Sequence, residues 1–200
     1  MSRARVLADF IGGTTTVSGT PTFTGTVSGA GSNIKERLVM LCDGNNYTVG
    51  SGTYTAANVS SIQALTTSYE DVTGSSISYT APSGTTMVVY EFIFSFTFTD
   101  SNPIAHVKFF IDSDEATSQR QTLTASGAIW QQSLRHVIPI GGSADTATGR
   151  QASWSGAKTL KIQAREYGSG NEGTLHSMSY WDASNVTDLI VPKLVITSLG

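Results

Sequence analysis

The chain has a single cysteine, Cys42, among its 200 residues, and therefore cannot form an internal disulfide. Its fold does not depend on an oxidising compartment. No run of the sequence approaches about 18 apolar residues, so we expect no membrane-spanning helix and no membrane partner. Arg3 and Arg5 resemble the basic start of a secretory signal, but Asp9 and the pair Gly12-Gly13 interrupt the apolar stretch that such a signal requires.

Charged residues are scarce, because Asp, Glu, Lys and Arg make up 14% of the chain, against roughly a quarter in typical globular domains. The net charge of −3 creates no basic field, so we expect no nucleic-acid partner. Thr, Ser and Gly are abundant instead. Surfaces of short hydroxylic side chains lose little side-chain entropy on contact, which favours a protein that works inside an assembly.

Motifs of catalysis and cofactor binding are missing. The sequence has no Gly-x-Ser-x-Gly elbow, no Cys-x-x-Cys, no His-Glu-x-x-His and no phosphate-binding glycine loop. Asp112, Asp114 and Glu115 lack the pattern of a calcium loop, and we interpret them as the end of a hairpin. The histidines at positions 106, 136 and 176 fall in separate predicted strands. We expect no enzyme activity, no cofactor and no metal site; the alternative is a metal held on an axis between subunits.

The stretch Met87–Phe98 is the centre of the predicted fold. It is rich in aromatic and β-branched residues and contains neither Gly nor Pro, which is typical of a β-strand. In a strand, one face carries every second residue, which are Val88, Tyr90, Phe92, Phe94, Phe96 and Phe98. This row predicts a core strand, part of which can also meet another subunit.

Several further strands follow, separated by Gly, Pro and Asn turns. We predict them at 35–42, 61–67, 75–80, 105–112, 117–124, 130–140, 158–167, 174–181 and 189–198. Many short strands at this spacing predict an all-β protein, and about eight of them in the body favour a jelly-roll-like β-sandwich. We divide the chain into an N-terminal docking arm at 1–34, a connecting strand and loop region at 35–60, and the sandwich body at 61–200.

The arm begins with a predicted short helix at 2–11. A helix of this length is unstable alone in water, so it must dock on something. Its basic and apolar side chains are the predicted docking residues: Arg3, Arg5, Leu7, Phe10 and Ile11. The segment 14–33 then has isolated apolar residues and would reach roughly 65 Å if fully extended. We interpret it as an extended arm on a partner surface, with contacts from Val17, Phe23 and Val27.

Two aromatic residues, Trp154 and Tyr167, are candidate glycan contacts, since aromatic rings stack on sugars. The alternative for a tryptophan at a strand end is that it closes the core. A glycosidase that uses Asp112 or Glu115 is a weaker hypothesis, because no partner carboxylate can be named.

Some stretches resemble structural proteins of tailed bacteriophages, cyanophages among them. These are the opening 1–13, the segments 66–74, 79–84 and 87–90, and the strand 158–165. The resemblance implies a homotrimeric β-body on the virion surface. Relatives of this kind are either cement proteins that clamp the capsid lattice or fibres that recognise hosts. Fibres carry a longer stalk or a larger tail-docking domain than the roughly 60 residues available here, so the resemblance favours a cement protein.

The resulting hypothesis is a non-enzymatic capsid cement (decoration) protein. It would bind the major capsid protein on the outer surface of the virion, as a trimeric knob, after assembly in the host cytoplasm. The alternative is a tail-fibre or receptor-binding module that recognises host surface glycans. A glycan hydrolase and a bacterial adhesin are less favoured.

Overall fold

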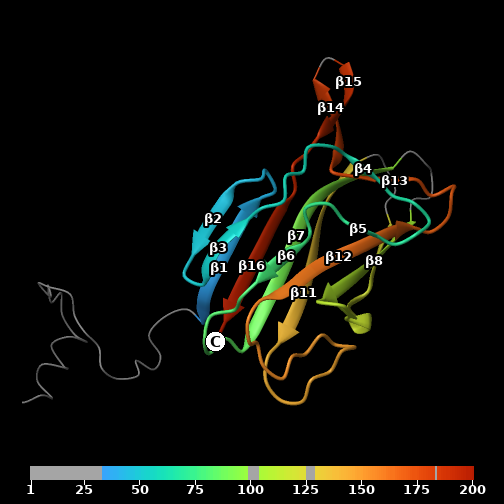
Figure 1. Ribbon diagram of the computed structural model, residues 1–200. Helices are drawn as coiled ribbons and strands as arrows, with labels where there is room; N and C mark the ends of the chain where they lie inside the picture. Colours follow the sequence, from blue (N-terminus) through green and yellow to red (C-terminus); the bar gives the residue numbers. More distant parts are fainter. Residues whose placement is uncertain (1–32, 99–103, 125–128, 183) are drawn as a thin grey trace, which may run out of the picture. The chain divides into compact units, whose positions relative to one another are not determined.

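The computed structural model describes residues 33–98, 104–124, 129–182 and 184–200 (Figure 1). Two antiparallel β-sheets share one hydrophobic core. Sheet I contains β1 (Ile34–Leu41), β16 (Lys193–Leu199), β7 (Met87–Phe98), β11 (Ile129–Pro139), β13 (Gly173–Leu175) and β4 (Gln63–Ala64). Sheet II contains β10 (Gln121–Thr124), β8 (Ile104–Ile111), β12 (Lys158–Glu166), β5 (Glu70–Asp71), β6 (Ile77–Tyr79) and β9 (Asp114–Glu115).

Two hairpins and one helical turn complete the described chain. The hairpins are β2 (Asn46–Val49) with β3 (Gly52–Thr55), and β14 (Ser177–Asp182) with β15 (Ser184–Leu189). The 3₁₀ turn η1 (Thr117–Gln119) lies between β9 and β10. The β14–β15 hairpin projects beyond the end of the sandwich (Figure 1).

The connectivity is that of a jelly roll, so the all-β sandwich expected from the sequence is confirmed. The eight principal strands, in chain order, are β1, β6, β7, β8, β10, β11, β12 and β16. Numbered one to eight, they follow the order 1-8-3-6 in sheet I and 2-7-4-5 in sheet II. This order places the first and last long strands side by side, with Leu38 opposite Ile196.

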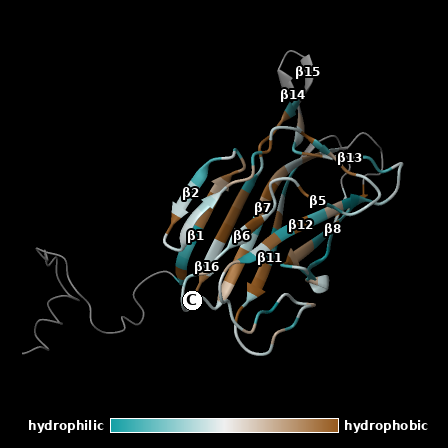
Figure 2. Cartoon of the chain, viewed as in Figure 1, coloured by the Kyte–Doolittle hydropathy of each residue, from teal (hydrophilic) through white to brown (hydrophobic). Residues whose placement is uncertain are grey.

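The aromatic row of β7 occupies the centre of the core, as predicted. Val88, Tyr90, Phe92, Phe94 and Phe96 are at most 2% exposed, whereas the side chain of Phe98 lies outside the described residues. The rings of Tyr90 and Phe109, one from each sheet, have centroids 5.1 Å apart. Hydrophobic and hydrophilic residues alternate along the strands (Figure 2). Burial of these five side chains stabilises the fold by roughly 8–15 kcal/mol before conformational entropy is subtracted.

Strand boundaries differ from the prediction at three places. The predicted strand 61–67 is reduced to Gln63–Ala64, and residues 117–119 of the predicted strand 117–124 form a 3₁₀ turn. The third difference is at the C-terminal end. The predicted strand 174–181 is divided at His176, whose φ of 61° is incompatible with a continuous strand. The N–H of His176 donates to the carbonyl of Ser95, and the N–H of Ile190 donates to the carbonyl of His176. These bonds join the base of the β14–β15 hairpin to sheet I. The predicted strand 189–198 begins at Lys193, after Pro192, which has no N–H for a ladder.

The region 35–60, expected to connect the arm to the body, supplies an integral strand of sheet I. β1 pairs with β16 from Ile34 to Leu41, and residues 33–200 form one compact unit. Of the arm predicted at 1–34, residues 1–32 lie outside the described residues.

A buried carboxylate links β1 to β6. Oε1 of Glu36 accepts hydrogen bonds from the Tyr79 hydroxyl at 2.8 Å and from Ser51 Oγ at 2.6 Å. The hydroxyls of Tyr79 and Ser198 are 2.8 Å apart. Burial raises the pKa of the Tyr79 phenol well above its usual value, so that it remains a donor to the carboxylate.

Replacing Tyr79 by phenylalanine is expected to lower the free energy of unfolding by about 1–3 kcal/mol, because Glu36 and Ser198 each lose a buried partner. Urea denaturation measures this change. Tyr47→Phe is the matched control, since the Tyr47 hydroxyl makes only long bonds, 3.3 Å to the Leu41 carbonyl, and should cost less than about 1 kcal/mol. Equal losses in the two variants would show that the buried hydrogen bonds of Tyr79 contribute no more to stability than the exposed ones of Tyr47.

Candidate protein-binding face

The side of sheet I that points away from the core is the most unusual surface of the described chain. Side chains alternate across a strand, so every second residue of β1, β16, β7 and β11 points outward. The ladder registers align these residues in four rows. We call the set the outer face: Ile34, Arg37, Val39, Leu41, Lys193, Val195, Thr197, Leu199, Met87, Val89, Glu91, Ile93, Ser133, Arg135, Val137 and Pro139.

Most residues of the outer face are apolar, and several are open to solvent. Val39 is 50% exposed, and Ile34 is 47% exposed; Val137 and Leu41 are also more than a third exposed. Of the large apolar side chains that the described chain leaves exposed, only Ile62 and Tyr167 lie elsewhere. Single exposed apolar residues are ordinary, but three on the edge strand β1 and a fourth on β11, all on the same side of one sheet, are typical of a surface that meets another molecule.

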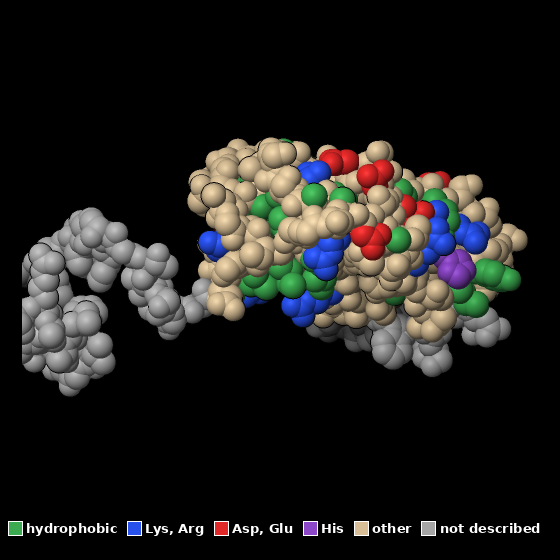
Figure 3. Space-filling view, turned by 90° about the horizontal axis from the view of Figure 1, so that it is seen from below, with side chains coloured by type: hydrophobic (Ala, Val, Ile, Leu, Met, Phe, Trp, Pro, Cys, Tyr) green, Lys and Arg blue, Asp and Glu red, His purple; other side chains and the backbone are tan. Residues whose placement is uncertain are grey.

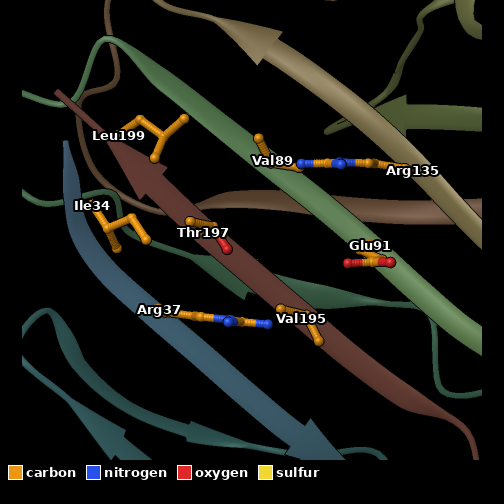
Figure 4. Close-up of a pocket in the computed structure, with 8 residues that line it drawn as sticks. All are labelled: Ile34, Arg37, Val89, Glu91, Arg135, Val195, Thr197 and Leu199. Carbon is orange, nitrogen blue, oxygen red and sulfur yellow. The ribbon is translucent and has the colours of Figure 1, made fainter. Parts of the chain in front are cut away.

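A hollow of about 390 Å³ lies in the middle of this face (Figure 4). Val89, Val195 and Thr197 belong to its lining, together with Ile34 and Leu199. Arg37 reaches over the sheet from β1, and Arg135 reaches over it from β11 on the opposite side (Figure 4). The hollow therefore combines apolar side chains with two guanidinium groups that enter from opposite sides and with the carboxylate of Glu91.

The two arginines have no ion-pair partners among the described residues. Glu91 stands directly opposite Arg135 in the ladder, but its Oε1 accepts a hydrogen bond from Ser133 Oγ at 2.6 Å instead. Arg37, Arg135 and Lys193 against the single carboxylate of Glu91 give the outer face a net charge of +2, in a chain whose net charge is −3. Figure 3 shows hydrophobic side chains gathered beside Lys and Arg on one side of the molecule.

Sheet II presents a different outer side, on which two lysines are paired with carboxylates. Lys108 lies 3.0 Å from Glu115, and Lys161 lies 3.0 Å from Asp71. The Lys108 ammonium also lies 4.2 Å from the centre of the Tyr69 ring, a cation–π contact. Arg165 forms no ion pair among the described residues, but it lies 5.3 Å from the same ring, so every cation named on this side already has a partner within the chain.

The acidic group at 112–115 is tied into these pairs. Asp112 accepts from Lys158 at 3.3 Å, and Glu115 also pairs with Arg120, which lowers the pKa of the Glu115 carboxyl. No group of three or more His, Cys, Asp or Glu suited to a metal occurs within the part of the chain that the structure describes. The interpretation of this segment as a hairpin end agrees with the β8–β9 pairing of Ile111 with Asp114.

The three histidines lie in three different environments. His136 is 1% exposed and stacks on Phe109 with ring centroids 4.2 Å apart, and His176 is fully buried beside Phe92. Burial lowers the pKa of both imidazoles to about 4, so both are neutral near pH 7. His106 is partly exposed and lies 5.9 Å from the Tyr167 ring.

Trp154 and Tyr167, the candidate glycan contacts, lie at opposite ends of β12. The indole N–H of Trp154 donates to the Tyr79 carbonyl at 3.3 Å, and Tyr79 pairs with Lys158, the first residue of β12. Tyr167 follows the last residue of that strand and is 60% exposed. At 3.3 Å per residue the two aromatic residues are on the order of 25–30 Å apart, so they do not form one sugar site.

The predicted docking and arm residues lie outside the described residues. They are Arg3, Arg5, Leu7, Phe10, Ile11, Val17, Phe23 and Val27. Sequence reasoning did not identify Arg37 and Arg135 as functional residues. Each looks like an ordinary polar position in an alternating strand, and only the register of β1, β16, β7 and β11 brings them to one hollow.

Comparisons with known proteins add little. No protein-family model matches the chain, and no curated protein matches it. Among solved structures, the tripod from the baseplate of bacteriophage Tuc2009 aligns with 100% of this chain and 93% of that one, at 12% identity and a TM-score of 0.22. A TM-score this low establishes neither a common fold nor a common function. No helix in the described ranges is long and apolar enough to cross a membrane.

Proposed function

We propose that the chain is a non-enzymatic structural protein of a bacteriophage virion, a cement protein that binds the major capsid protein on the outside of the capsid. The observation that carries a structural role is the outer face of sheet I. It is largely apolar, spans four strands and carries arginines that have no ion pair within the described part of the chain, features of a surface that binds protein. The assignment to a phage rests on the sequence resemblance of the opening segment and the β-body.

In this proposal the protein makes two kinds of contact, one with the capsid and one between its own subunits. The segment 1–13 binds the capsid through Arg3, Arg5, Leu7, Phe10 and Ile11, and the segment 14–33 spans the distance to the body. The bodies associate as a homotrimer. Each of the three subunits carries one such docking segment. Once the first segment has bound, the other two are held close to the capsid at a high effective concentration, so weak docking by each segment is enough to hold the trimer in place.

Deleting residues 1–13 is expected to abolish binding to capsids and to leave the β-body folded. Cosedimentation of purified protein with undecorated capsids measures the binding, and circular dichroism measures the fold. The full-length triple variant L7S/F10S/I11S should lose binding as well, because it removes the apolar contacts and keeps the chain length. Full occupancy of capsids by either variant would contradict the docking assignment.

The alternative is a receptor-binding module of a tail fibre. Tyr167 supports it, since this ring is exposed beside His106 and is available for stacking on a sugar. Quantitative mass spectrometry of purified virions distinguishes the two functions. Hundreds of copies per particle fit a cement protein, and a few to a few dozen fit a fibre.

A further inference from the structure

We propose that the outer face of sheet I is an interface between copies of this chain, and that the contact is head-to-tail. In this arrangement Arg37 and Arg135 of one copy bind carboxylates on a different surface of the next copy. The inference rests on the proposed structural role and names the partner of the face described above.

The chemistry of the face defines what must cover it. Val39, Ile34, Val137 and Leu41 need an apolar cover, because each is more than a third exposed. The guanidinium groups in the hollow need acceptors, and planar carboxylates bind guanidinium through two parallel hydrogen bonds. Glu91 accepts a hydrogen bond from Ser133, and no described carboxylate forms an ion pair with Arg37 or Arg135, so in the proposal the acceptors come from another molecule.

The charge of the chain favours a second copy as that molecule. The outer face carries +2, while the whole chain carries −3, so the remainder of the chain carries −5. The rest of another copy therefore offers the excess of carboxylates that the face lacks. Electrostatic complementarity of this kind directs association and fixes which surfaces meet.

The same charge balance argues against a two-fold, face-to-face pair. Such a pair would place two surfaces of charge +2 against each other and remove four arginines from water without acceptors, which is costly. A head-to-tail contact joins unlike surfaces instead, and it produces a closed ring when the rotation between copies closes. A ring of three would agree with the homotrimer expected from the sequence resemblance.

Pairing through the β11 edge is also disfavoured. The side-chain amide of Gln119 bonds to both backbone groups of Val137, accepting from its N–H at 3.1 Å and donating to its carbonyl at 2.8 Å. An added strand would have to displace this amide, which already satisfies the backbone of the edge strand. The bonds of Gln119 to Val137 therefore favour the face over this edge as the route of association.

The test is the mass of the purified full-length protein in solution, without capsids. Light scattering after size-exclusion chromatography should give the mass of a closed oligomer, with a trimer expected. The variant R37E/R135E should weaken association roughly 100-fold or more and yield monomers at micromolar concentration. The matched control R120E/R165E changes the net charge equally at arginines beside β10 and in β12 of sheet II, and it should keep the wild-type mass. The variant V39D keeps both arginines and places a charge in the apolar part of the face, at a position that is 50% exposed. It should also weaken association.

A wild-type protein that remains monomeric at high concentration would overturn the inference, as would an R37E/R135E variant that keeps the wild-type mass. A wild-type dimer would overturn the head-to-tail arrangement. Capsid cosedimentation of the 1–13 deletion reports on the proposed function separately, because that deletion leaves the outer face unchanged.

Discussion

Replacing Phe92 by alanine is expected to lower the free energy of unfolding by about 3–5 kcal/mol, the usual cost of removing a fully buried aromatic ring. Phe92 is 0% exposed, and its ring lies 5.4 Å from Phe94 and 6.2 Å from His176. In the ladders it stands opposite Leu194 on one side and Leu134 on the other, both buried. The cavity would therefore open on the core side of β7, between the side chains of Leu194 and Leu134. Urea denaturation followed by circular dichroism measures the loss.

The matched control lies on the other side of the same sheet. Val39 is 50% exposed, so Val39→Ala should change the free energy of unfolding by less than about 0.5 kcal/mol in the monomer. A small loss in Phe92→Ala, comparable to that of the control, would show that β7 is not the centre of the core.

Acidification is the second large effect, because the fold contains two neutral buried histidines. The pKa of an imidazole is 6.5 in the unfolded chain and about 4 in the folded one for both His136 and His176. Above pH 6.5 both states are neutral, and these residues make no difference to stability. Between pH 6.5 and 4 the unfolded state binds more protons, so the free energy of unfolding falls by about 1.4 kcal/mol per pH unit for each histidine. The loss approaches roughly 3 kcal/mol for each histidine near pH 4.

Burial lowers the pKa of both imidazoles, because the surroundings of the rings offer a proton few hydrogen-bond acceptors. Among the residues that the structure describes, neither ring nitrogen of His136 has a hydrogen-bond partner, and His176 has one at Nε2 only, 3.1 Å from Thr73 Oγ1. A proton added to either ring would bring an unpaired charge into an aromatic core.

Urea denaturation at a series of pH values measures the acid effect. His136→Phe keeps an aromatic ring against Phe109 and removes one titrating group, so the pH slope between 6.5 and 4 should fall to about half. An unchanged slope in this variant would mean that other groups cause the loss. If the wild-type protein is equally stable at pH 7 and pH 4.5, the assignment of both histidines is wrong.

Local patterns in the sequence were sufficient to predict most strands. The alternation from Met87 to Phe98 predicted β7 almost to the residue, because burial of one aromatic face allows no other register. The alternation from Lys158 to Arg165 predicted β12 equally well. Prediction failed at His176, where the side-chain pattern continues but the backbone turns. That turn follows from bonds to Ser95 and Ile190, which are distant in sequence.

The candidate binding surface was much less predictable. Arg37 and Arg135 are nearly one hundred residues apart, and each alternates with buried residues as any surface position does. The jelly-roll order places β1 beside β16 and β11 beside β7, and this order alone brings the two guanidinium groups to one hollow.

The sequence by itself determined that this is an all-β protein with an aromatic core strand, because side-chain period and turn chemistry are local properties of the chain. Tertiary structure decided which strands are neighbours, which side of sheet I is left uncovered, and that Trp154 lies against Tyr79 at the other end of β12 from the exposed Tyr167. These depend on pairing between segments far apart along the chain, and no local pattern specifies that pairing.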